Sequence, residues 1–234
     1  MGETIQIGTT RTQCIGAYLA KPSGMPQGGL VVVQEIFGVN AHIRSVVDRF
    51  AAAGYVAIAP AFFDHVEHRV ELDYAPESWA RARELVAATP FERTLEDVAS
   101  AAASIASSGP VGVVGYCWGG TVAMLSAMRL GLPAVGYYGS RNVNFLHEPL
   151  RAPTMLHFGE RDKSIPAEAI ARHRAELHFA DDVPPAQREL AIHVYPADHA
   201  FNRDATPDCH DDASAALARE RTLAFFARHL GGAR

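Results

Sequence analysis

The stretch around Cys117 contains residue types at a spacing that could perform nucleophilic chemistry. An apolar run at residues 111–115 leads into Gly115-Tyr116-Cys117-Trp118-Gly119-Gly120, and a segment of helical periodicity follows. Glycines around a central nucleophile permit a tight strand-to-helix turn that exposes its side chain, and a helix N-terminus favours negative charge on sulfur. We therefore predict that Cys117 is a nucleophile at such a turn. The alternative is a small buried cysteine whose neighbouring glycines only allow close packing.

A cysteine nucleophile needs a base beside it and an acid that orients this base. In proteins with this strand-turn-helix motif the chain order is nucleophile, acid, histidine. Asp162 and His199 appear in this order, each a few residues after an apolar run that is typical of a strand. We predict a triad of Cys117, His199 and Asp162. Glu160 and Asp198 are rival acids, although Asp198 adjoins the histidine, and Asp162 could instead cap a following helix.

Glu35 is a further candidate catalytic residue, because it lies at the end of the predicted strand that contains the apolar run Val31-Val32-Val33. A charge at the end of a buried strand is costly unless it has a task. Glu35 could instead cap the next helix or pair with an arginine.

The elements that must position these residues follow from hydrophobic periodicity. Short apolar runs rich in Val and Ile alternate with longer segments of helical period, which is typical of βαβ units. Central strands are predicted at 29–34, 55–59, 111–115, 134–138, 154–158 and 191–195, and an antiparallel edge hairpin at 4–7 and 14–20. Covering helices are predicted at 41–53, 95–107, 119–130, 166–179 and 211–230. The fold class is α/β, with a mostly parallel central sheet and helices on both faces.

The chain of 234 residues contains no repeat or low-complexity linker, so we predict one domain over residues 1–234. Residues 62–90 mix charged and aromatic side chains, with a short helical stretch near 79–88. Because open α/β sheets bind ligands beyond the carboxyl ends of their strands, this excursion is a candidate wall of the substrate site.

Composition narrows the kind of partner. A net charge of −5 without a lysine or arginine cluster does not predict a basic surface that would bind nucleic acid. Cys14, Cys117 and Cys209 form no CxxC pair, and His65 and His68, taken as surface residues, lack a third metal ligand. We expect no metal or organic cofactor, a small-molecule substrate, no membrane partner, and a monomer or small homo-oligomer. With neither a leader-like N-terminus nor a membrane-length apolar run, we expect a cytoplasmic protein.

Four segments resemble the dienelactone hydrolase family, which includes carboxymethylenebutenolidase. They are residues 34–40, 115–120, 135–139 and 199–203, and the likeness spans nearly the whole chain. The resemblance implies the α/β-hydrolase fold and a triad of Cys117, His199 and Asp162 with Glu35 as an additional internal carboxylate. It also implies hydrolysis of dienelactone to maleylacetate.

The resemblance further implies that arginines hold a substrate carboxylate. Arg203 matches the arginine that follows the catalytic histidine in this family. The second arginine belongs to the excursion at 62–90, where we predict Arg81, with Arg83 as the competitor. Either arginine could instead be a solvated surface charge. Phe37 and Tyr138, which lie within the matching segments, are expected to line the substrate site.

The predicted reaction is attack of the Cys117 thiolate on the carbonyl, with the backbone amides of Ile36 and Trp118 as the oxyanion hole. His199 then activates a water that hydrolyses the thioester. Two alternatives stay open: a carboxylesterase or thioesterase for other small acyl groups, and a ligand-binding protein that keeps the fold without catalysis.

Overall fold

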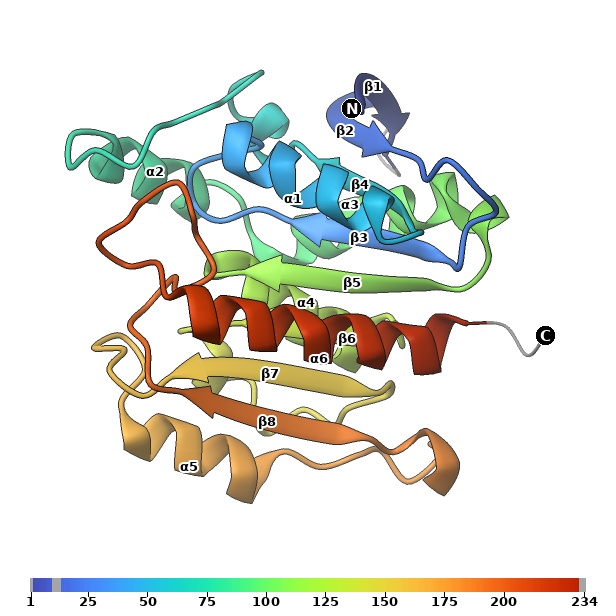
Figure 1. Ribbon diagram of the computed structural model, residues 1–234, viewed down its shortest axis with the longest axis vertical. Helices are drawn as coiled ribbons and strands as arrows, with labels where there is room; N and C mark the ends of the chain where they lie inside the picture. The colour runs from blue at the N-terminus through green and yellow to red at the C-terminus, as the bar shows by residue number, and fades with distance from the viewer. Residues whose placement is uncertain (1, 10–13, 232–234) are drawn as a thin grey trace. The chain divides into compact units, whose positions relative to one another are not determined.

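The computed structural model describes residues 2–9 and 14–231, and these form two compact units (Figure 1). The first unit contains the residues up to Gly112 and those from Leu230 onward. The second unit is Val113–His229. Each unit is described by itself. The predicted domain 1–234 includes residues 1, 10–13 and 232–234, which lie outside the described residues, and its being a single domain stays a prediction.

The first unit contains four strands in the order β1-β2-β4-β3. They are β1 (Glu3–Gly8), β2 (Cys14–Ala20), β3 (Gly29–Val33) and β4 (Val56–Pro60). β1 and β2 form the predicted antiparallel hairpin, with Ile5 opposite Ala17, and β3 runs parallel to β4. β3 and β4 are buried along their whole length, which explains their continuous apolar sequences.

The helices of this unit are α1 (Ala41–Ala52), α2 (Ser78–Ala87) and α3 (Phe91–Ser104), with short 3₁₀ turns η1 (Phe62–His65) and η2 (Ala106–Ser108). Both α1 and α3 contact β3 and β4, with α1 in front of these strands and α3 behind them in Figure 1. The predicted start of α3 at residue 95 is wrong. The helix begins four residues earlier, directly after Pro90. The prediction missed this start because the polar residues Glu92, Arg93 and Thr94 separate Phe91 from the regular apolar period that starts at Leu95.

The second unit has four parallel strands in the order β5-β6-β7-β8. They are β5 (Val111–Tyr116), which enters this unit at Val113, β6 (Ala134–Tyr137), β7 (Thr154–Gly159) and β8 (Leu190–Tyr195). The helices are α4 (Trp118–Arg129), α5 (Ala167–Glu176) and α6 (Asp212–Leu230). In Figure 1, α6 lies in front of these strands and α4 behind them. The predicted parallel sheet with helices on both faces is therefore confirmed in this unit.

Helix α5 is shorter than the predicted 166–179. It ends at Glu176, because the next residues leave the helix to pair with another segment. Leu150 donates its N–H to the carbonyl of His178 at 2.8 Å, and Ala180 donates to the carbonyl of Leu150 at 2.9 Å. This pairing satisfies backbone groups that the helix would otherwise have used.

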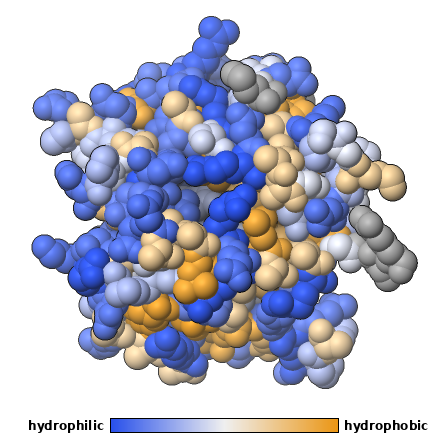
Figure 2. All heavy atoms as spheres, in the orientation of Figure 1, coloured by the Kyte–Doolittle hydropathy of each residue, from blue (hydrophilic) through white to orange (hydrophobic). Residues whose placement is uncertain are grey.

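Large apolar side chains lie mostly inside. Among the described residues the exposed ones are Met25, Val66, Val194 and Leu217, and these come from separate elements. Hydrophilic side chains cover most of the face drawn in Figure 2, with separate apolar areas between them. Within the described part of the chain, no helix has the length and hydropathy needed to cross a bilayer.

Candidate active site

Cys117 occupies a sharp turn between β5 and α4. Its φ of 55° and ψ of −116° lie outside the regions that residues other than glycine favour. A Cβ added to Gly115 would collide with the backbone of Gly119, and one added to Gly120 would collide with the carbonyl of Tyr137. Only glycine fits at these two positions, so the predicted tight turn is confirmed.

Three side chains of the second unit form a hydrogen-bonded row. His199 Nε2 lies 3.3 Å from the sulfur of Cys117, and His199 Nδ1 lies 2.6 Å from Asp162 Oδ2. The other oxygen of Asp162 accepts the backbone N–H of Ser164 at 2.8 Å, and the Asp162 side chain is fully buried. The carboxylate is thus fixed on both oxygens, and the imidazole is held between acid and thiol as general-base catalysis requires.

The two rival acids lie elsewhere. Asp198 is half-exposed and accepts a hydrogen bond from the guanidinium of Arg161 at 3.2 Å. Glu160 is exposed on the loop after β7. Among the carboxylates weighed from the sequence, Asp162 is the one that bonds His199.

The surroundings of His199 favour its protonated form. Burial alone would lower the pKa of the imidazole, but the charge of Cys117 and the hydrogen bond that the ring donates to Asp162 outweigh it and raise this pKa to about 10. The site can therefore hold an imidazolium at neutral pH.

Backbone strain gathers around this row. Four described residues other than glycine have positive φ, and three of them are Cys117, Tyr138 and Ala200, the residue after His199. Such conformations cost about 1–3 kcal/mol each and persist where the surrounding structure enforces them. Tyr138 is buried, and its ring centroid lies 5.1 Å from that of His199. Its substrate-lining role stays a prediction.

Arg203 lies in the same segment as His199 and is held by two residues that the sequence analysis did not single out. Its Nε donates to Thr206 Oγ1 at 2.7 Å, and its Nη2 lies 3.5 Å from the sulfur of Cys209. The hydroxyl of Thr206 and the sulfur of Cys209 are themselves 3.0 Å apart. In the sequence, the only indication that Thr206 and Cys209 contact Arg203 was their spacing of three and six residues from it.

The remaining predicted residues lie at the ends of buried elements. Glu35 and Phe37 of the first unit are buried in the segment after β3, and Ile36 between them is partly buried. Trp118, in the second unit, is buried as the first residue of α4, so its amide belongs to the first helical turn. The amides of Ile36 and Trp118 remain the predicted oxyanion donors.

The two candidate arginines of the excursion differ in their partners. Arg81 is ion-paired with Glu67 and also with Glu84, at 2.9 Å from the latter, on an exposed surface. Arg83 instead lies 5.7 Å over the ring of Trp79, within cation–π range.

Trp79 and Tyr74, which the sequence analysis did not select, both pack on Phe37. Their ring centroids lie 5.4 Å and 4.8 Å from that of Phe37. The excursion thus contributes aromatic side chains around a predicted substrate residue.

One interpretation from the sequence is wrong. His65 was taken as a surface residue, but its side chain is only 3% exposed, and its Nε2 lies 2.9 Å from Asp97 Oδ2. His68 is exposed as expected. Among the described residues, no group of three or more His, Cys, Asp or Glu side chains could hold a metal ion.

The whole chain is similar in structure to solved α/β hydrolases. An alpha-beta serine hydrolase homologue from Coxiella burnetii matches with a TM-score of 0.63 at 11% identity, covering 93% of this chain and 96% of that one. Together with the strand-turn-helix at Cys117, this likeness identifies an α/β hydrolase fold.

The family follows from closer relatives. Residues 15–230 match the model of the dienelactone hydrolase family. Carboxymethylenebutenolidase 1 of Cupriavidus pinatubonensis is 31% identical over 236 residues, which cover 97% of each chain. A crystal structure of a Klebsiella pneumoniae protein, described as a candidate dienelactone hydrolase, matches with a TM-score of 0.80 at 31% identity over 97% of this chain and 99% of that chain. The chain belongs to the dienelactone hydrolase family.

Proposed function

We propose that this protein hydrolyses a small carboxylate-bearing enol-lactone, converting dienelactone to maleylacetate, through an acyl-enzyme on Cys117. The observation that carries the proposal is the placement of His199 between the sulfur of Cys117 at 3.3 Å and the carboxylate of Asp162 at 2.6 Å. Membership of the family and the name of the Cupriavidus relative support the lactone as substrate. The protein acts in the cytoplasm, as a single domain, on a small molecule.

In the first half-reaction the Cys117 thiolate attacks the lactone carbonyl. The negative charge that develops on the carbonyl oxygen is stabilised by the amides of Ile36 and Trp118. When the tetrahedral intermediate collapses, the ring C–O bond breaks and the enol oxygen takes the proton of the His199 imidazolium. The product is a thioester on Cys117, and the histidine is left neutral.

In the second half-reaction the neutral His199, oriented by Asp162, removes a proton from water as the water attacks the thioester. The C–S bond then breaks, which releases the acid and returns the thiolate beside an imidazolium. None of these proton transfers uses a metal or an organic cofactor. A raised His199 pKa serves the first step, because the imidazolium must survive until the leaving oxygen needs its proton.

The substrate carboxylate is held by Arg203, and the acyl body lies against Phe37 and Tyr138. Arg81 or Arg83 supplies a second cation. Arg81 is the first choice: its two ion partners lie on an exposed surface, where such pairs are weak and a substrate carboxylate can displace them. Glu35, buried to 1% exposure, controls the ionisation of Cys117: it accepts the thiol proton when substrate arrives, and it returns this proton to the thiolate once the acid has been released.

The test is hydrolysis of dienelactone and of a neutral ester of similar size by matched variants. For Cys117→Ala we expect kcat/KM to fall by about 10⁴-fold or more, because the nucleophile is lost while alanine fits its space. Cys14→Ala is the control, since Cys14 is an exposed thiol on β2. Glu35→Gln keeps the shape of the side chain without its charge and should lower kcat while KM changes little.

Stoichiometric labelling with iodoacetamide should block activity at Cys117. Appreciable turnover by Cys117→Ala, or a blocking label on Cys14 or Cys209, would contradict the acyl-enzyme. A wild-type kcat in Glu35→Gln would remove Glu35 from the mechanism. A higher kcat/KM for the neutral ester than for the lactone would favour a general esterase.

A further inference from the structure

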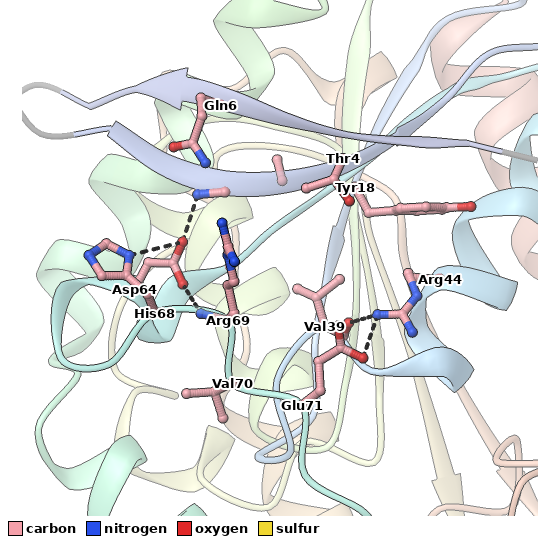
Figure 3. Close-up of a pocket in the computed structure, with 13 residues that line it drawn as sticks. Thr4, Gln6, Tyr18, Val39, Arg44, Asp64, His68, Arg69, Val70 and Glu71 are labelled. Carbon is pink, nitrogen blue, oxygen red and sulfur yellow. Dashed lines mark hydrogen bonds and ion pairs between the residues drawn. The ribbon is translucent and has the colours of Figure 1, made fainter.

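The first unit contains an open cavity of about 690 Å³ that none of the predicted catalytic or substrate-binding residues lines. Its walls come from β1, β2, α1 and the segment at residues 68–71 (Figure 3). A volume in this range is typical of sites for small organic ligands. Nothing in the proposed reaction uses this cavity.

Two of the charged side chains in the cavity are already paired with each other. The guanidinium of Arg44 lies 2.7 Å from the carboxylate of Glu71, and it also donates to the carbonyl of Val39 at 2.8 Å. Because their charges cancel, this ion pair makes its side of the cavity electrically neutral.

The carboxylate of Asp64 is occupied by backbone donors. Its Oδ2 accepts the N–H of Gly16 at 2.7 Å, and its Oδ1 accepts the N–H of Arg69 at 2.9 Å. The Asp64 side chain is only 4% exposed, so it is built into the wall and does not reach out to a cation in the cavity.

Among the described residues that line the cavity, the side chain of Arg69 therefore supplies the permanent charge that no ion pair occupies, since His68, 3.7 Å from Asp64 Oδ2, is charged only when protonated. Its guanidinium points into the cavity in Figure 3, and within the described residues it makes neither a side-chain hydrogen bond nor an ion pair. A guanidinium offers a planar fork of N–H donors that matches a carboxylate.

The backbone conformation of Arg69 indicates that the arginine side chain has a function at this position. Arg69 has a φ of 60°, in the left-handed region that glycine adopts without cost. A residue with a long side chain costs stability in this conformation. The position would be better suited to glycine if only the turn mattered.

The rest of the cavity suits an apolar body with a polar end. Val39 and Val70 form apolar surface beside Arg69, while Thr4 and Gln6 of β1 offer a hydroxyl and an amide (Figure 3). We propose that this cavity binds a small organic acid, with its carboxylate on Arg69 and its apolar body against Val39 and Val70. A multiply charged anion such as phosphate fits less well, because the carboxylates of Asp64 and Glu71 flank Arg69.

Titration calorimetry with benzoate tests this site in the intact protein. Benzamide serves as a neutral ligand of the same shape, and inorganic phosphate as an anion without an apolar body. Arg69→Gln should weaken benzoate binding by about tenfold or more, because a charge-assisted bidentate contact is lost. Arg172→Gln is the matched control, since it removes an exposed arginine that pairs with Glu176 on α5.

Arg203→Ala separates this cavity from the site beside His199, and benzoate binding at Arg69 should persist in that variant. Thr4→Trp, which fills the cavity without changing its charge, should abolish binding. Equal binding of benzoate by Arg69→Gln and wild type, equal affinity for benzamide, or binding lost only in Arg203→Ala would overturn the proposal. So would phosphate binding through Arg69 without benzoate binding.

A stability measurement distinguishes a ligand-binding arginine from a structural one. Arg69→Gly relieves the left-handed backbone, so its Tm should equal or exceed that of wild type while benzoate binding is lost. A Tm lowered by several degrees would show that Arg69 holds the loop together, and would overturn the inference.

Discussion

At the scale of single residues, His199 is defined by the two groups that bond its ring. Cys117 and Asp162 approach opposite nitrogens of the imidazole, and together they raise its pKa to about 10 in spite of burial. A histidine in this state can protonate a leaving oxygen at neutral pH, which an unperturbed imidazole with a pKa of about 6.5 would do poorly.

Replacing Asp162 by asparagine tests this origin of the pKa. The variant keeps a side chain of similar size but loses the negative charge, so the imidazolium is less stable and its pKa falls. We expect the alkaline limb of the kcat/KM profile to follow the raised pKa of His199, about 10, and to move to lower pH in the variant. The maximal rate should fall by about 10²–10⁴-fold, as the tautomer is also no longer fixed.

The measurement is a pH–rate profile with a neutral ester, accompanied by a circular dichroism spectrum to confirm folding. A neutral ester keeps substrate charge out of the profile. An unchanged alkaline limb would show that Asp162 does not determine the protonation of His199.

At the scale of elements, the sequence predicts best where burial on both faces makes the pattern simple. β3 and β7 are buried throughout, and their mainly apolar sequences place them within a residue of the predicted ends. α3 and α5 were misjudged at their ends. At the start of α3, the polar residues after Phe91 do not show the apolar period of a helix. At the end of α5, the residues after Glu176 pair with Leu150, a contact that only the tertiary structure supplies.

The same distinction explains what could be predicted of the site. Cys117, Asp162 and His199 were predictable because each follows a segment that the sequence pattern identifies as a strand, in the chain order that the fold imposes. The surface ion pairs of Arg81 and the burial of His65 were not predictable. They depend on the path of residues 62–90, where no periodicity fixes neighbours.

The segment after β8 carries both His199, the proposed catalytic base, and Arg203, the proposed carboxylate-binding arginine. Thr206 orients the side chain of Arg203, because its hydroxyl accepts a hydrogen bond from Arg203 Nε at 2.7 Å. Arg203→Ala should raise KM for the anionic lactone by about tenfold to a hundredfold, the value of a charge-assisted hydrogen bond, and affect a neutral ester much less.

Thr206→Val should give a smaller effect in the same direction, about twofold to tenfold in KM for the lactone, because one neutral hydrogen bond is lost. Thr206→Ser keeps the hydroxyl and should restore the wild-type KM. Equal changes of KM on the anionic and neutral substrates would mean that Arg203 supports the fold of the segment and does not bind a carboxylate.

At the scale of the whole molecule, the second unit is held together by a polar network inside its core. The ring of His157 is fully buried, with Nδ1 2.8 Å from the hydroxyl of Tyr195 and Nε2 3.1 Å from that of Thr222. The Thr222 hydroxyl lies 2.7 Å from that of Tyr137. The network thus connects β6, β7, β8 and α6. Burial, with the nearby charges of His193 and Arg221, lowers the pKa of His157 well below its usual value.

Buried histidines make the stability of the protein depend on pH in two opposite ways. For His157 and His173 the folded pKa is lowered, chiefly by burial, so below about pH 6.5 only the unfolded chain takes up their protons and stability falls. For His199 the folded pKa is raised. Its contribution is complete below about pH 6.5 and is lost as the pH rises through about 10. Together these histidines favour maximal stability near neutral pH.

Denaturant unfolding between pH 5 and 8 tests the acid side of this argument with His157→Gln. Glutamine can keep hydrogen bonds to Tyr195 and Thr222, so the variant should fold, but it cannot take up a proton when it unfolds. The slope of the unfolding free energy below about pH 6 should therefore decrease by up to about 1.4 kcal/mol per pH unit, the value for one proton. His147→Gln, which removes an exposed histidine, should leave this slope unchanged. Identical slopes for wild type and His157→Gln would show that His157 is protonated equally in both states and does not destabilise the protein in acid.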